Sequence, residues 1–97
     1  MRKRNTESLG EVLQEFFSEN QFFRQKLAES RVVSGWPKLM GKAVSSYTTS
    51  IYMRNGILHI SISSSVLRSE LIMAKDVLIE KINQMAGLPV VKDIIFR

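Results

Sequence analysis

The residues of this chain that could do chemistry are basic and aromatic rather than catalytic. The sequence has no cysteine and a single histidine, His59, so it offers no thiol nucleophile, no disulfide framework and no set of zinc ligands. Serines are plentiful, but a serine nucleophile needs a neighbouring base and an orienting acid, and nothing in the sequence places an acid beside His59. We therefore expect no enzymatic activity, no cofactor and no metal site.

Positive charge is concentrated in part of the chain. The net charge of +5 arises mainly from an N-terminal tail and from a span between positions 31 and 68 that contains five basic residues and no acidic one. These residues are Arg2, Lys3 and Arg4 in the tail and Arg31, Lys38, Lys42, Arg54 and Arg68 in the span. Such an asymmetry is typical of a surface that meets phosphate. The alternative is the ordinary charge of a soluble protein.

Aromatic rings accompany this charge. Tyr52 and His59 face each other if the hairpin described below forms, and Arg54 lies on the same face. Stacking of a nucleic-acid base on such a ring contributes on the order of 1–3 kcal/mol, and basic side chains hold the phosphates. The sequence thus predicts a nucleic-acid-binding set that consists of Arg2, Lys3, Arg4, Lys38, Lys42, Tyr52, Arg54, His59 and Arg68.

Four phenylalanines near the N-terminus form a second candidate surface. Phe16 and Phe17 are adjacent, as are Phe22 and Phe23, and one helix stripe cannot bury both members of an adjacent pair. The simpler explanation is packing between helices, and the alternative is an exposed partner-binding patch. In the second case Phe17 and Phe23 would contact the partner.

The first half of the chain reads as helices. Ser8 and Glu11 have the spacing of a capping box, which predicts a helix over residues 8–18. A second helical stretch follows Asn20 and is expected to reach about Val33, before a bend at residues 35–37 and a short helix at 38–46. We expect residues 1–7 to be a disordered basic tail and residues 8–97 to be a single domain.

A β-hairpin is the clearest local signal. Asn55-Gly56 is the preferred pair for a two-residue type I′ turn, and alternating runs flank it at 49–54 and 57–62. The turn sets the register, with Tyr52 opposite His59 and Thr49 opposite Ile62. One face of the pair is apolar and is expected to meet the core.

The last third of the chain is predicted to form a helix followed by a strand. Leu67, Leu71, Ala74, Leu78, Ile82 and Met85 recur at steps of three and four. They predict one long helix, with Ser64 or Ser65 as its cap and Gly87 at its end. Residues 90–97 read as a third strand. The fold class is therefore α+β, in the order α-α-(α)-β-β-α-β: a small KH-like domain whose three-stranded sheet is covered by helices on one face.

The same segments resemble a known family. The motifs are Gly35-Trp36-Pro37-Lys38-Leu39-Met40-Gly41-Lys42-Ala43-Val44, Tyr47-Thr48-Thr49, Asn55-Gly56-Ile57-Leu58-His59-Ile60-Ser61-Ile62-Ser63-Ser64, Glu70-Leu71, Ile82-Asn83 and Ile94-Ile95-Phe96-Arg97. Together they resemble the DciA-type domain, a bacterial family that includes loaders of the replicative DNA helicase. Leu67 replaces an aromatic that family members often have, and the Gly-x-x-Gly motif of KH domains is missing.

The resemblance implies a KH-like fold, binding to single-stranded or forked DNA, contact with the hexameric replicative helicase and no enzymatic activity. Our first hypothesis is a cytoplasmic, non-enzymatic DNA-binding protein that assists the helicase. The alternative is a protein-interaction adaptor that uses the Phe-rich helices and does not bind nucleic acid. Both exclude the membrane and leave open a monomer or weak homodimer as the assembly, and the first hypothesis also leaves open RNA as a ligand.

Overall fold

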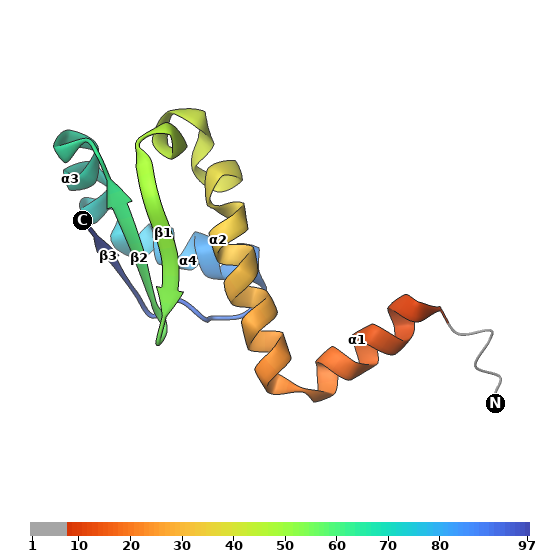
Figure 1. Ribbon diagram of the computed structural model, residues 1–97. Coiled ribbons are helices and arrows are strands. Elements are labelled where there is room, and N and C mark those ends of the chain that lie inside the picture. Colours follow the sequence, from red (N-terminus) through yellow and green to blue (C-terminus); the bar gives the residue numbers. More distant parts are fainter. Residues whose placement is uncertain (1–7) are drawn as a thin grey trace.

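The computed structural model describes residues 8–97, apart from the side chains of residues 16–18. The predicted tail with Arg2, Lys3 and Arg4 and the side chain of Phe17 therefore lie outside the described residues. The elements are α1 (Leu9–Glu19), α2 (Gln21–Ser46), β1 (Thr48–Arg54), β2 (Ile57–Ile62), α3 (Ser65–Met73), α4 (Lys75–Ala86) and β3 (Asp93–Phe96), as Figure 1 shows. This arrangement confirms the predicted α+β class with a three-stranded sheet.

Both N-terminal helices begin at side-chain caps. The predicted capping box is present, because Ser8 Oγ accepts the Glu11 amide at 3.0 Å and Glu11 Oε1 accepts the Ser8 amide at 3.3 Å. Asn20 separates the helices, and its Oδ1 accepts the Phe23 amide at 3.2 Å to start α2. From this junction α1 projects away from the rest of the protein (Figure 1).

The predicted bend is present but misplaced, since it lies at Gly41 and not at residues 35–37, and the short helix that follows it is therefore residues 42–46 and not 38–46. Helix α2 continues through Pro37 and departs from helical geometry only at Gly41, where φ is 89° and ψ is 172°. Ala28, Val32 and Trp36 are buried at steps of four along this helix. Proline removes one backbone hydrogen bond, and that loss is outweighed by burial of this stripe before Pro37 and by packing of the partly buried Leu39, Met40 and Val44 after it.

Trp36 joins α2 to the sheet. Its ring is 1% exposed, and its Nε1–H donates to Thr48 Oγ1 at 3.0 Å. The Thr48 hydroxyl in turn donates to the carbonyl oxygen of Val44 at 3.0 Å. Because a buried indole N–H needs an acceptor, this chain of bonds fixes how the end of α2 meets the start of β1.

The sheet has the order β1-β2-β3, with β1 antiparallel and β3 parallel to β2. Asn55 and Gly56 form the turn with positive φ values of 53° and 81°, as a type I′ turn requires. The predicted register holds from the turn to Ser50 opposite Ser61, but the chain shifts by one residue beyond Ser50, so that Thr48 and not Thr49 pairs with Ile62. An irregularity at this end of the strand separates the two registers.

One face of the sheet meets the core. Leu58, Ile60 and Ile62 from β2 and Ile94 from β3 are buried there. In Figure 1 α4 passes behind the strands, and no helix lies in front of them. The opposite face, which we call the open face, therefore remains accessible.

The predicted single long helix is divided at Ala74 into α3 and α4. A straight helix over residues 65–86 would be about 33 Å long, whereas a seven-residue strand spans only about 20 Å. The division lets α3 contact β2 and β3 while α4 packs against α2. Leu71, Leu78 and Ile82 of the predicted stripe are buried, so the apolar pattern is satisfied by two helices.

Strand β3 begins at Asp93 and not at residue 90. Before it, Asn83 of α4 holds the backbone of Val91, with Nδ2 donating to the Val91 carbonyl at 3.0 Å and Oδ1 accepting the Val91 amide at 2.9 Å. A side chain therefore supplies the two bonds that a neighbouring strand would have made.

Candidate nucleic-acid interface

Two rings are stacked on the open face. The Tyr52 and His59 rings have centroids 4.7 Å apart and planes inclined by 4°. This pair follows from the hairpin register, which places the two residues directly opposite each other. Tyr52 is 42% exposed, so much of its ring remains in contact with solvent.

A third residue on the open face was not predicted from the sequence. Arg97 Nη1 lies 3.1 Å from His59 Nδ1. A guanidinium can only donate, so Nδ1 of His59 accepts this bond. Arg97 is held by main-chain bonds to β2, from its amide to the Ile60 carbonyl at 2.8 Å and from the Ile62 amide to its own carbonyl at 2.7 Å. Its nearness to His59 depends on the parallel pairing of β3 with β2, which no local pattern indicates.

The predicted basic residues do not form one cluster. Arg54 is exposed at the turn end of the hairpin, two residues from Tyr52 and on the same face. Lys42 lies near the end of α2 and Arg68 follows the end of β2, and the strand ends next to them, Thr48 and Ile62, are paired. About 20 Å of strand separates the two groups. Only Arg54 is therefore adjacent to the stacked rings along β1.

The remaining predicted residues have different surroundings. Lys38 and Lys42 are exposed on α2. Arg68 is partly buried, and its guanidinium donates to the carbonyl oxygen of Ile62. Arg31, which belongs to the same acid-free span, donates to the Ala86 carbonyl at 3.2 Å at the end of α4. Two of the five basic residues in this span thus bind carbonyl oxygens of the fold itself.

The structure describes every residue of the three strands, and among them only Asp93 is acidic. The pKa of this exposed carboxyl is lowered, first by the hydrogen bond that it accepts from the Ile94 amide at 2.8 Å and then by Lys75 at 3.3 Å. The ion pair with Lys75 offsets the negative charge at this end of the sheet.

The phenylalanines at the start of α2 are exposed. Phe22 is 64% and Phe23 is 43% exposed, and their rings meet edge to face at 5.8 Å. Lys26 Nζ lies 5.7 Å from the centre of the Phe22 ring. Phe23 is thus accessible at the surface, although its ring also contacts that of Phe22.

No helix among residues 8–97 combines the length and apolarity needed to cross a bilayer. Within the same part of the chain, no group of three histidine, aspartate or glutamate side chains is arranged to hold a metal ion.

In the comparisons with known proteins, the sequence model of a family described as "Dna[CI] antecedent, DciA" matches residues 8–96. No curated protein and no solved structure matches.

Proposed function

The chain belongs to the DciA family, which is associated with loading of the replicative helicase, and from this premise we propose that it is a non-enzymatic DNA-binding protein that assists that helicase. The family match confirms the resemblance seen in the sequence and spans nearly the whole chain. Single-stranded or forked DNA is the proposed nucleic acid, and the cytoplasm is the compartment in which such a protein would act.

The observation that supports DNA binding is the Tyr52–His59 stack on the open face. His59 covers one face of the Tyr52 ring, so a base would stack on the opposite face, at the outer edge of the sheet. Arg54 and Arg97 flank the two rings and supply positive charge for the phosphates. Rings that accept any base, together with cations that accept any phosphate, suit a ligand recognised without regard to sequence.

Fluorescence anisotropy with labelled single-stranded, forked and duplex DNA and with RNA, each over a range of salt concentrations, tests this proposal. Tyr52→Ala should weaken binding to single-stranded DNA by about 5- to 150-fold, which corresponds to the loss of one stacking contact of about 1–3 kcal/mol. Tyr47→Ala is the matched control, because Tyr47 is 48% exposed but lies at the opposite end of β1. Equal losses in both variants, or none in either, would exclude the stack as the binding site.

A second candidate function is an adaptor that binds the helicase through α1 and the start of α2. Its support is a run of exposed apolar side chains on these two elements: Leu9, Val12, Leu13, Phe22, Phe23 and Leu27. Co-elution of the chain with purified replicative helicase in gel filtration should be lost in the double variant Phe17→Ala, Phe23→Ala, with unchanged thermal unfolding. Co-elution of the variant would contradict this function. Gel filtration of the chain alone also reports whether it is a monomer or a weak homodimer.

A further inference from the structure

A cleft lies at the turn end of the hairpin, beside the start of α2. Its volume is about 590 Å³, and its walls come from three places: the first turns of α2, the hairpin turn, and the segment that leads from α4 to β3. These segments are distant in sequence but lie near one another in the lower part of Figure 1. The cleft is partly open to solvent, so an extended ligand could enter and leave it.

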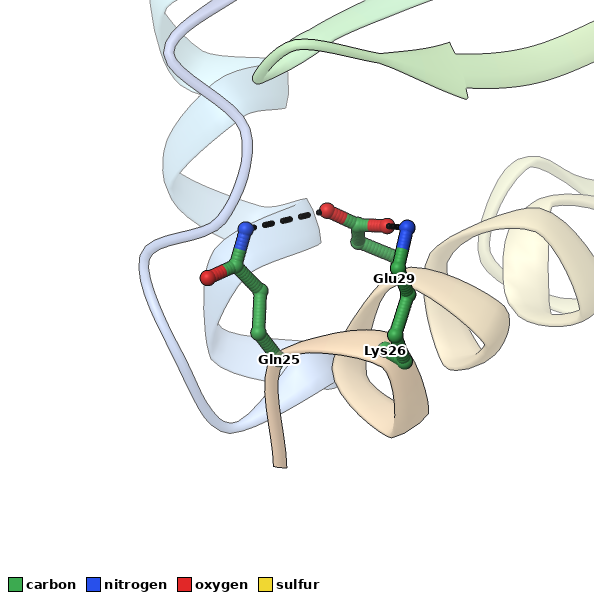
Figure 2. A network of polar contacts seen from close by, with 3 residues as sticks. All are labelled: Gln25, Lys26 and Glu29. Carbon is green, nitrogen blue, oxygen red and sulfur yellow. Dashed lines mark hydrogen bonds and ion pairs between the residues drawn. The ribbon is translucent and has the colours of Figure 1, made fainter. Parts of the chain in front are cut away.

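The charge of the cleft is mostly positive. Arg24, Lys26, Arg54 and Lys92 line it, against the single acid Glu29. Glu29 is occupied by its neighbours on α2, since Lys26 Nζ lies 3.6 Å from one carboxylate oxygen and Gln25 Nε2 donates to the other at 3.3 Å. Figure 2 shows this carboxylate held between the two side chains.

Three cations of the cleft lack a compensating anion. Among the residues that the structure describes, Arg24, Arg54 and Lys92 have no carboxylate partner and no side-chain hydrogen bond. Like charges around one concave site repel each other, and an anion bound between them would remove that repulsion. Arginine guanidinium and lysine ammonium groups bind phosphate oxygens through charge-assisted hydrogen bonds.

The hairpin turn places Lys92. The Lys92 amide donates to the Gly56 carbonyl at 2.8 Å. The Lys92 side chain passes so close to the turn that a Cβ on Gly56 would lie 3.3 Å from Lys92 Cδ. The absence of a side chain at Gly56 thus allows the stem of Lys92 to lie along the turn. Arg54, immediately before the turn, borders the same cleft.

Arg54 connects this cleft with the open face. It projects from the same face of β1 as Tyr52, two residues or about 6.6 Å away along the strand. No aromatic side chain lines the cleft, whose lining residues are all described, so it offers a base no stacking surface. Its chemistry suits phosphates and not bases.

We propose that this cleft binds backbone phosphates of a single nucleic-acid strand whose base stacks on Tyr52. The inference rests on the proposed function and extends it, because it assigns Arg24 and Lys92 as phosphate-binding residues. It also gives the bound strand a path over the surface, from the open face past Arg54 and toward the start of α2. Arg54 contacts the phosphate between the stack and the cleft.

The test compares Arg24→Gln and Lys92→Gln, singly and together, with the control Lys81→Gln. Lys81 is an exposed lysine of α4 that does not line the cleft. For single-stranded DNA, each lost phosphate contact should reduce the slope of log K against log salt by about 0.7, so the double variant should lose about 1.4. The control should retain the wild-type slope, and thermal unfolding of each variant confirms that it is folded.

A second readout does not require DNA. Titration of the wild-type chain with inorganic pyrophosphate should shift the amide NMR signals of Gly56 and Lys92, and the double variant should show no such shift. If pyrophosphate shifts these signals but no DNA binds, the cleft is an anion site and the proposed function is wrong. If DNA binds, the double variant keeps the wild-type slope and pyrophosphate shifts neither signal, the cleft proposal is overturned and the proposed function stands.

Discussion

Gly41→Ala tests whether backbone geometry shapes the end of α2. Gly41 has φ of 89° and ψ of 172°, a combination that is accessible essentially only to glycine. A Cβ added there would have no atom within 4 Å. The substitution therefore introduces backbone strain without a steric clash, so no part of a stability loss comes from overpacking.

The magnitude follows from two opposing effects. A non-glycine residue in this region destabilises the native state by about 1–3 kcal/mol. Alanine also reduces the conformational entropy of the unfolded chain, which offsets about 0.4–1 kcal/mol of that loss. We expect a net loss of about 1–2 kcal/mol, which for a domain of this size lowers Tm by roughly 5–15 °C.

Thermal unfolding followed by circular dichroism measures the effect. Gly10→Ala is the control, because Gly10 lies within α1 and its added Cβ would meet only Ser8 Oγ at 3.8 Å. This variant should not lower Tm. D-alanine at position 41, introduced by chemical synthesis, should restore the wild-type Tm because its chirality favours positive φ. An unchanged Tm in Gly41→Ala, or an equal loss with D-alanine, would refute the explanation.

Two further predictions concern the segment before β3 and Asp93, the first residue of β3. Asn83→Ala should destabilise the protein by about 2–5 kcal/mol in urea unfolding, because it leaves both backbone groups of the buried Val91 without partners; a loss below about 1 kcal/mol would contradict this role. Asp93→Asn should flatten the acid dependence of stability. The folded-state pKa of Asp93 is lowered below 3.8, so its contribution is present above that pH and is lost as the pH falls through the folded-state pKa. Chemical unfolding of both proteins between about pH 5 and pH 2 should show the wild type losing more stability than the variant, and parallel curves would count against the assignment.

The features that could be predicted from the sequence depend on residues close together in the chain. The Ser8–Glu11 capping box and the Asn55-Gly56 turn are each complete within four residues, so no distant contact is needed to specify them. The turn sets the register of the hairpin near it, and the Tyr52–His59 stack follows from that register alone. This is why the pairing of these two rings was predicted correctly from the sequence.

The features that were missed depend on partners far along the chain. A proline inside a helix favours a kink or a break, but the buried Trp36 and Val32 bind this part of α2 to the core, and the helix continues through Pro37. The division at Ala74 likewise reflects the size of the sheet that the helices must cover.

The gathering of basic side chains at one cleft also depends on the tertiary structure. Composition identified an acid-free span between positions 31 and 68, yet the cleft takes only Arg54 from it and adds Arg24 and Lys92 from either side. The sequence by itself determined the amount of positive charge, the paired rings and the helix caps. The tertiary structure decided which charges gather, because only the parallel pairing of β3 with β2 and the packing of α2 bring residues 24, 54 and 92 to one cleft.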